Sequence, residues 1–404
     1  MKILLVSQYY YPERFSVSDI AEALVKEGNE VSVLTGRPNY GFQQILPEYK
    51  HVKYEEINGV KVHRVSLKPR KFSRLSIIQN YLSVHRNAKR FVRHFKEEFD
   101  VVLSISLSPV ISISPALLYA KKHKVPCVVY CQDLWPESTL VTHAVKKNSL
   151  TYKFLYKWSK SIYSRADRIV VSSPSFKEYF EKELNIKDKV FNVVNQPILN
   201  STNHSEPVVY KNKHNLVYAG NIGKLQLTDL LVESMKYVKT EDLKLHLMGM
   251  GSELPYIKEK IAKEHLEDKV IYEGAYPIEK AETYYVNADA LIVSLKNEGY
   301  VGRTIPNKAI QYMKYGRPLL VVAKGDTKEI LSKANGSLFA EEDPKDIAQK
   351  IDEICALNKK DLLGLNNKVY FEEHFTTEVL THLLLEELIS AKKWFIDSAW
   401  TFRP

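Results

Sequence analysis

Residues 290–318 have the sequence ALIVSLKNEGYVGRTIPNKAIQYMKYGRP, which passes from an apolar run through a glycine-bearing loop to a helical pattern. The opening apolar run has the composition of a buried parallel strand. Pro306 suits the first turn of the helix, and Gly316 suits its end. Free backbone amides at the helix start, together with the charges of Arg303 and Lys308, predict an anion site. The alternative is a solvated surface loop that binds nothing.

Similar alternation of short β-branched runs and helical patterns extends through the whole chain. In the first half, strands are expected at 2–7, 30–35, 60–65, 101–105, 127–130, 168–171 and 190–194, with a helix at 19–27. In the second half, strands are expected at 215–219, 244–248, 270–272, 290–294 and 319–323, with a helix at 227–235. Alternation of this kind predicts an α/β protein with parallel sheets.

A polar, proline-bracketed stretch at 195–207 has the composition of an interdomain linker. It divides the chain into an N-terminal domain, 1–198, and a C-terminal domain, 208–380. A segment at 381–404 continues a helical pattern that starts at Glu372, and we expect it to pack back toward the N-terminal domain. Because ligands bind outside the carboxyl ends of parallel strands, the two domains are expected to face a central cleft.

The net charge of +10 indicates an anionic partner, which could be nucleotide phosphate, lipid headgroups or nucleic acid. Three cysteines cannot form a disulfide framework, and the spacing of Cys127 and Cys131 is weak support for zinc, so we expect buried thiols, a reducing cytosol and no metal. No apolar stretch is long enough to cross a bilayer. No nucleic-acid-binding motif accompanies the charge, so nucleic acid is the least favoured partner.

Between Lys68 and Lys96 there is no acidic residue, and basic side chains alternate with apolar ones. A basic amphipathic segment of this kind can lie on an anionic membrane surface. The alternative is an ordinary helix that packs on the core and has a basic outer face. The residues of this segment expected at a membrane or acceptor are Arg70, Arg74, Arg86 and Arg90.

Further motifs are QYYYPE at 8–13, TGRPNY at 35–40, QDLWPES at 132–138 and GNIG at 220–223. With the 290–318 segment, they resemble retaining family-4 glycosyltransferases of the GT-B fold, which consists of two Rossmann-like domains facing a cleft. They are most similar to the bacterial branch that adds N-acetyl-L-fucosamine and related amino sugars in O-antigen or capsule assembly. The resemblance implies transfer with retention from a UDP-sugar to a lipid-linked saccharide. We expect a polyprenyl-linked acceptor, with the protein held peripherally at the inner face of the cell membrane.

Four positions depart from the pattern that this resemblance implies. Gln311 stands where the family has a carboxylate that holds the ribose, while the literal Glu-Gly-aromatic match is Glu298. Asn221 and Gln226 stand where the family has an Arg and a Lys that neutralise the diphosphate. Gln132 replaces a histidine. Compensating charge is therefore expected from Lys224, Arg303 and Lys308, and the orientation of substrate hydroxyls from Asp133.

The resemblance assigns site residues in three groups. The catalytic candidates are Asp133, Glu298 and Arg303. The donor-binding candidates are Gly220, Asn221, Gly223, Lys224, Gln226, Gly249, Tyr276, Thr304, Ile305, Pro306, Asn307, Lys308 and Gln311. The acceptor or membrane candidates are Glu13, Ser16, Arg37, Asn39 and Trp135, with the four arginines named above. No cofactor is expected besides the UDP-sugar substrate.

Two other functions remain compatible with these motifs. A nucleotide-sugar epimerase uses the same two-domain fold, but it would need several acid/base groups in the cleft and no lipid-facing segment. A catalytically silent protein that only binds a sugar nucleotide is compatible with the neutral residues at 221, 226 and 311.

Overall fold

The computed structural model describes residues 1–13, 15–71, 73–141, 144–193, 195, 206–276, 278–358 and 360–401. The chain divides into two compact units, the first formed by residues 1–199 and 377–404 and the second by residues 200–376. Most of the linker expected at 195–207 lies outside the described residues.

The first unit is built on an eight-stranded sheet in the order β3-β4-β2-β1-β5-β6-β7-β8, in which only β3 runs antiparallel to its neighbour. Its central strand β1 pairs with β2 and β5, and the side chains of Ile3, Leu4 and Leu5 are fully buried. Parallel strands covered on both faces need such continuous apolar runs. The strands are β1 (Lys2–Val6), β2 (Glu30–Gly36), β3 (Tyr54–Ile57), β4 (Val60–Val65), β5 (Val101–Ser106), β6 (Cys127–Cys131), β7 (Arg168–Val171) and β8 (Val190–Val193).

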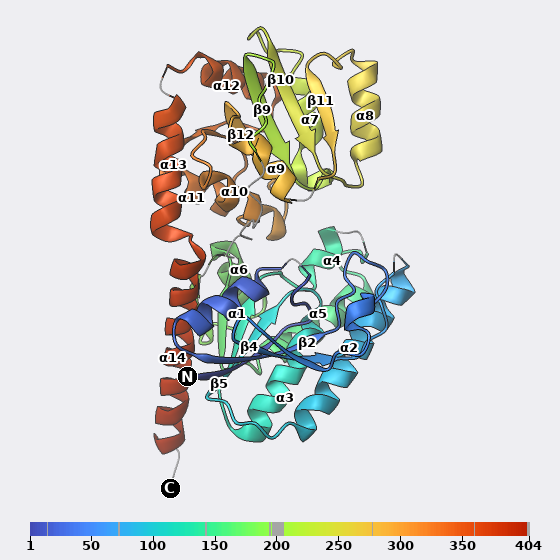
Figure 1. The fold of residues 1–404 in the computed structure, drawn as a ribbon, viewed down its shortest axis with the longest axis vertical. Coiled ribbons are helices and arrows are strands. Elements are labelled where there is room, and N and C mark those ends of the chain that lie inside the picture. Colours follow the sequence, from blue (N-terminus) through green and yellow to red (C-terminus); the bar gives the residue numbers. More distant parts are fainter. Residues whose placement is uncertain are drawn as a thin grey trace. The chain divides into compact units, whose positions relative to one another are not determined.

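Helices cover both faces of this sheet (Figure 1). The crossover from β1 to β2 through α1 and the crossover from β4 to β5 through α2 run in opposite directions across the sheet. Right-handed connections therefore put α1 on one face and α2, α3 and α5 on the other. The last helix, α14, packs beside α1 and also contacts β5, β6 and β7. The helices are α1 (Val17–Lys26), α2 (Arg74–His94), α3 (Ser114–His123), α4 (Glu137–Val141), α5 (Leu150–Tyr163), α6 (Pro174–Glu178) and α14 (Thr377–Thr401), with short turns η1 (Pro47–Tyr49), η2 (Val110–Ile113) and η3 (Tyr179–Glu183).

The second unit contains a six-stranded, fully parallel sheet in the order β11-β10-β9-β12-β13-β14. Numbered along the unit, this is the order 3-2-1-4-5-6 of a dinucleotide-binding fold. The strands are β9 (His214–Ala219), β10 (Leu243–Met248), β11 (Val270–Gly274), β12 (Ala290–Ser294), β13 (Leu319–Val322) and β14 (Ser337–Phe339).

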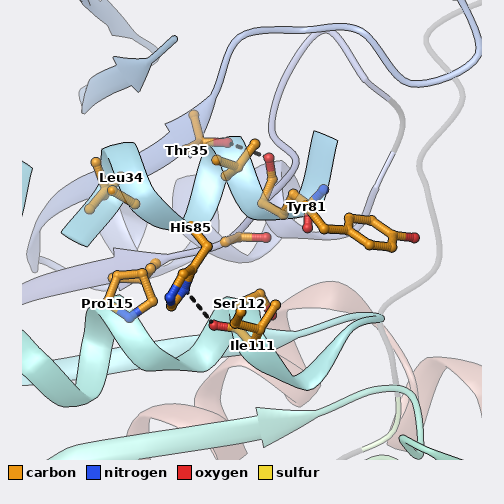
Figure 2. A pocket seen from close by; sticks show the side chains of 12 residues that line it. Leu34, Thr35, Tyr81, His85, Ile111, Ser112 and Pro115 are labelled. Carbon is orange, nitrogen blue, oxygen red and sulfur yellow. Dashed lines mark hydrogen bonds between the residues drawn. The ribbon is translucent and has the colours of Figure 1, made fainter. Parts of the chain in front are cut away.

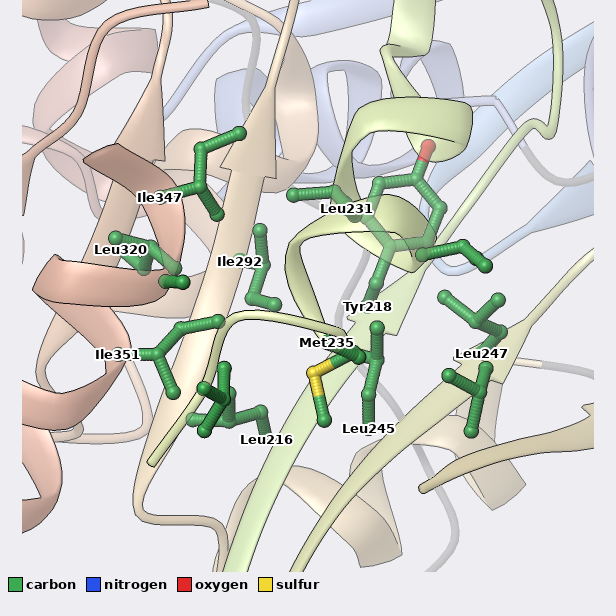
Figure 3. Close-up of a cluster of buried hydrophobic side chains, with 14 of the residues drawn as sticks. Leu216, Tyr218, Leu231, Met235, Leu245, Leu247, Ile292, Leu320, Ile347 and Ile351 are labelled. Carbon is green, nitrogen blue, oxygen red and sulfur yellow. The ribbon is translucent and has the colours of Figure 1, made fainter. Parts of the chain in front are cut away.

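Helices of the second unit bury a continuous apolar core against this sheet. Figure 3 shows Leu216, Leu245 and Ile292 of the strands facing Met235 and Ile351. The helices are α7 (Thr228–Ser234), α8 (Leu254–Lys263), α9 (Ile278–Tyr285), α10 (Asn307–Met313), α11 (Gly325–Ala334), α12 (Pro344–Ala356) and α13 (Lys360–His374), with turns η4 (Lys224–Gln226) and η5 (Val301–Arg303).

The predicted α/β architecture with parallel sheets is confirmed. The sequence patterns do not predict the short strands β3 and β14. Runs of four and three residues are too short to show the alternation of buried and exposed side chains that marks a strand. The prediction of one continuous helix from Glu372 to the end of the chain is wrong, because α13 ends at His374 and α14 begins at Thr377. No helix in the described part of the chain has both the length and the apolar character of a membrane span.

Candidate functional site

The centre of the second sheet is a topological switch point, because the chain leaves β9 toward β10 and leaves β12 toward β13, on opposite sides. Ligands of open α/β sheets bind at the carboxyl ends of the strands at such a point. The loops that follow the two strands are joined there: the Ser294 hydroxyl donates to the carbonyl of Gln226 at 2.5 Å, and the Lys296 amide donates to the carbonyl of Leu225 at 2.7 Å. The predicted donor-binding loops therefore share one edge of the sheet.

Glycines allow the backbones around this edge to approach closely. Gly220 and Gly249 have φ values of +146° and +130°. A Cβ atom on Gly249 would lie 1.8 Å from the carbonyl oxygen of Gly220, so only glycine fits. Close packing of the loops after β9 and β10 therefore accounts for the glycine at position 249.

Lys308 places a buried amine at the switch point, next to the ring of Tyr218. Its Nζ lies 3.8 Å from the centre of the Tyr218 ring, and a Cβ atom on Gly220 would be 3.5 Å from it. The Nζ is buried, and no described residue forms a hydrogen bond with it. Burial lowers the pKa of Lys308 to about 7. A buried ammonium without a counterion is costly, so this arrangement favours an anionic ligand.

Helix α10 holds Lys308 in place. The Tyr312 hydroxyl accepts a hydrogen bond from the Ala219 amide and donates one to the Ala219 carbonyl, both at 2.9 Å, which ties the helix to the end of β9. The prediction that Pro306 lies in the first turn is wrong: Pro306 precedes the helix in extended conformation, with ψ of 143°. Lys308 is the second residue of the seven-residue helix α10.

The rest of the 290–318 loop packs on its own unit. The Thr304 carbonyl accepts a hydrogen bond from the Thr327 hydroxyl at 2.6 Å, and the Arg303 guanidinium lies 5.9 Å from the Tyr300 ring centre. Ile305 and Pro306 are half-buried, while Asn307 is exposed. These contacts fix the course of the loop toward α10.

Glu298 and Gln311 point to different environments. The Glu298 side chain is 63% exposed and forms an ion pair with Lys296 at 2.9 Å. Gln311 is buried, and its amide lies 3.5 Å from a carboxylate oxygen of Glu282 on α9. Neither is paired with Lys308.

Neutral side chains form the rim of the loop after β9. The Asn221 amide donates to the Gln226 side chain at 2.9 Å, next to Gly223 and the exposed Lys224. Tyr276 is half-buried, with the Lys280 Nζ 3.7 Å from the centre of its ring. The side chains of Asn221 and Gln226 thus form a hydrogen bond with each other, and neither carries a charge. The buried basic group at this edge is Lys308.

In the first unit, Asp133 follows β6 and is held by serines. Ser108 donates a hydrogen bond to the Asp133 carboxylate, and the Ser108 hydroxyl lies 3.0 Å from that of Ser138. Burial raises the pKa of Asp133, although these hydrogen bonds act in the opposite direction. The preceding Gln132 directs its amide to the Ser16 hydroxyl at 3.5 Å. Asp133 is therefore a positioned carboxylate at the carboxyl edge of the sheet.

A small pocket lies between the carboxyl ends of β1 and β2 and helix α2 (Figure 2). Its volume of about 20 Å³ suits a single water molecule rather than a sugar. The His85 ring bonds the Ile111 carbonyl through Nδ1 at 3.1 Å, and burial lowers the pKa of His85 to about 4, so the ring is neutral. Ser7 and Ser112 present buried hydroxyls that no described residue bonds.

Most acceptor candidates support the loops of this edge. Glu13, Ser16, Asn39 and Trp135 are buried, and the Arg37 side chain donates to the Val52 carbonyl at 3.3 Å. Arg74, Arg86 and Arg90 are exposed on α2. The Glu13 carboxylate accepts hydrogen bonds from the amides of Asn39 and Tyr40 at 2.7 and 2.6 Å.

Sequence reasoning missed Tyr218 and Ser108, which position the two main charged candidates. Tyr218 lies 90 residues before Lys308, and Ser108 lies 25 residues before Asp133. Tyrosine in a strand and serine in a turn are both common, so neither residue type indicates a functional role. Only the position of each at the carboxyl end of a predicted strand could have indicated a role.

Comparisons with known proteins agree with this geometry. The model "Glycosyltransferase Family 4" matches residues 15–198, and the model "Glycosyl transferases group 1" matches residues 213–356. A curated relative, the probable glycosyltransferase WbjE of Pseudomonas aeruginosa, is 27% identical over 285 residues, covering 67% of this chain and 70% of the relative.

Solved structures share the fold at low sequence identity. Sucrose-phosphate synthase from Thermosynechococcus elongatus superposes with a TM-score of 0.72 at 18% identity, covering 96% of this chain and 99% of that one. Anabaena Alr3699/HepE in complex with UDP and glucose gives 0.67 at 13% identity, covering 96% and 100%. The chain therefore consists of a family 4 and a group 1 glycosyltransferase domain, and it is a glycosyltransferase with the GT-B fold.

Proposed function

We propose that the protein transfers an amino sugar, N-acetyl-L-fucosamine or a similar sugar, from a UDP-sugar to a saccharide linked to polyprenyl diphosphate. The reaction belongs to O-antigen or capsule assembly and proceeds with retention and without a metal. The protein acts in the cytoplasm, attached to the inner face of the cell membrane. The motifs at 35–40 and 132–138 support the amino-sugar class through their resemblance to that branch.

The observation that carries the donor half of this proposal is the buried ammonium of Lys308, which lacks a partner among the described residues at the switch point of the second sheet. A diphosphate supplies the missing negative charge. Lys308 then neutralises it in place of the Arg and Lys that the family has at the positions of Asn221 and Gln226. The complex of Alr3699/HepE with UDP and glucose supports UDP as the nucleotide, since the folds are similar.

The chemistry requires stabilisation of the charge that develops on the β-phosphate as the sugar leaves. Lys308, Arg303 and the amides of the glycine-bearing loop after β9 can provide it as fixed electrostatic groups. Asp133 orients a substrate hydroxyl, because its carboxylate is held by Ser108 and retains a free lone pair.

Membrane attachment is supported by the surface of α2. Leu75, Ile78 and Leu82 are 66%, 53% and 53% exposed, and their spacing puts them on one side of the helix. Val84 and Val92 point to the core on the other side. Moreover, α2, α3 and α5 together contain no Asp or Glu, so the charged side chains of these three helices are all basic. Exposed apolar side chains within a basic face suit an anionic leaflet.

One assay tests the proposal against its competitors. UDP-N-acetyl-L-fucosamine and related UDP-amino sugars are incubated with the protein, with and without a lipid-linked amino-sugar acceptor and with EDTA throughout. UDP release that depends on acceptor supports transfer. An isomerised donor would indicate an epimerase, and donor binding without turnover would indicate a silent module; either result contradicts the proposal.

A further inference from the structure

Arg70, in the loop between β4 and α2, lies in a cage of tyrosines at the carboxyl edge of the first sheet. Its Nη1 donates to the hydroxyls of Tyr9 and Tyr81 at 3.0 and 3.1 Å. Its guanidinium also lies 4.9 Å from the centre of the Tyr40 ring and 5.5 Å from that of Tyr81. These three tyrosines and Arg70 are called the arginine cage below.

The Arg70 guanidinium has no carboxylate in direct contact among the described residues. Burial raises the pKa of Tyr9 and of Tyr81, so both hydroxyls stay neutral at physiological pH. Arg70 forms no ion pair with a carboxylate of the described residues, and apart from burial its pKa responds most strongly to Tyr9, Tyr81 and Tyr40. The acidic groups Glu13 and Asp133 act on Tyr9 and Tyr81. A half-buried cation surrounded by neutral partners favours a bound anion, because partial desolvation has already weakened its hydration.

The guanidinium is held in position before any ligand binds. The Arg70 amide donates to Asn39 Oδ1 at 3.0 Å, which also accepts from the Asn80 side chain at 3.0 Å. The Tyr9 ring stacks on Phe15 at 4.7 Å. With Nη1 used by two hydroxyls, Nε and Nη2 remain without a partner among the described residues, and these groups match the geometry of phosphate oxygens.

Exposed aromatic surface adjoins this cation. The side chains of Tyr40 and Phe42 are 42% and 47% exposed, and the Phe42 amide donates to the Asn39 carbonyl at 3.3 Å. A ligand that fits here combines a phosphate group with an apolar chain. The cage also gathers residues that follow β1, β2 and β4, where ligands of such sheets bind.

We propose that the arginine cage binds the diphosphate that joins the acceptor saccharide to its polyprenyl chain, with the first isoprene units on Tyr40 and Phe42. This inference rests on the proposed function and gives the acceptor a site of its own in the first unit. An anionic lipid headgroup offers similar phosphate chemistry, so the experiment must separate the two sources.

The probe is citronellyl diphosphate, which has two isoprene units and no sugar, titrated calorimetrically into the full chain in saturating UDP. We expect Arg70→Gln to weaken its binding about 10- to 100-fold, as for loss of a charge-assisted bidentate contact. Arg70→Lys should recover only part of the affinity, because it restores charge but not the planar fork. The control Lys26→Gln removes one exposed charge from α1 on the opposite face and should bind like the wild type.

Vesicles of phosphatidylglycerol provide the second arm. Arg70→Gln should bind these vesicles as the wild type does. If Arg70→Gln loses vesicle binding but keeps its affinity for citronellyl diphosphate, the inference is overturned. Equal affinity of the wild type and Arg70→Gln for citronellyl diphosphate also overturns it. Circular dichroism and the urea unfolding midpoint of the variant report whether the first unit, which carries Arg70, is still folded. Failure of the proposed function looks different: the wild type would bind citronellyl diphosphate in an Arg70-dependent way yet release no UDP with any acceptor.

Discussion

At the scale of single residues, the proposed function rests on two basic groups that have no acidic partner in direct contact in the described part of the chain. The Lys308 Nζ is buried against Tyr218, and Arg70 is surrounded by neutral phenols. Each arrangement costs stability in the free protein. Such costs are tolerated at sites where a ligand supplies the opposite charge.

The lowered pKa of Lys308 predicts that UDP binding takes up a proton. Between about pH 7 and the ordinary value of 10.5, the unfolded chain holds a proton on this lysine that the folded chain lacks, so the group opposes folding and the penalty shrinks as pH rises through that window. A bound diphosphate raises the pKa again. At pH 8 we expect Lys308 to take up most of a proton when UDP binds, and near pH 5.5, where it is already protonated, to contribute almost nothing to the uptake.

Calorimetric titration of UDP in buffers of different ionisation enthalpy measures this uptake. Lys308→Met should abolish the uptake, weaken UDP binding and raise the unfolding midpoint, since it removes an unpaired buried charge. Equal proton uptake by wild type and Lys308→Met would contradict the assignment.

Asp133→Asn should lower acceptor-dependent UDP release by about 10²-fold while UDP affinity stays unchanged, because the neutral amide accepts a hydrogen bond from a substrate hydroxyl more weakly than the carboxylate does. Steady-state kinetics with a matched Asp188→Asn variant, at an exposed position, gives the comparison. Full activity of Asp133→Asn would remove this residue from the mechanism.

At the scale of helices and strands, sequence patterns predict much of the fold. Buried parallel strands such as β12 are short β-branched runs, and Gly28 and Gly316 end helical segments by adopting positive φ. The contacts of Lys308 are not predictable in this way, because Tyr218 and Gly220 are about 90 residues away along the chain. The same holds for Gln311, whose match to a ribose-binding position gives no sign of its neighbour Glu282.

Helix α2 gives an element-scale prediction. Replacing Leu75, Ile78 and Leu82 together by serine should weaken binding to phosphatidylglycerol vesicles at least tenfold, because three partly exposed apolar side chains no longer enter the leaflet. Cosedimentation with neutral phosphatidylcholine vesicles serves as the comparison. Unchanged pelleting of the variant, or equal pelleting of the wild type with both lipids, would show that α2 is an ordinary surface helix.

At the scale of the whole molecule, the chain leaves the first unit near residue 199 and contributes to it again from residue 377. Helix α14 is fastened there by an ion pair between Glu387 and Arg168 at 2.5 Å, in which both side chains are largely buried, and by Lys392 and Asp100 at 2.8 Å. The 25 residues of α14 are therefore part of the packed structure of the first unit.

Glu387→Gln should lower the free energy of unfolding by about 2–4 kcal/mol, because it leaves the buried Arg168 without its anionic partner. Glu386→Gln changes the adjacent, exposed carboxylate and should shift the free energy by less than about 0.5 kcal/mol. Urea unfolding followed by circular dichroism measures both. Equal effects of the two substitutions would mean that the ion pair does not hold α14 in place.

The central claim is that a UDP-sugar binds at the switch point of the second sheet through the charge of Lys308. A crystal structure of the protein with UDP tests it most directly. We predict diphosphate oxygens within about 3.2 Å of the Lys308 Nζ, beside the loop after β9. UDP bound at another place, with Lys308 still buried and unpaired, would contradict the account.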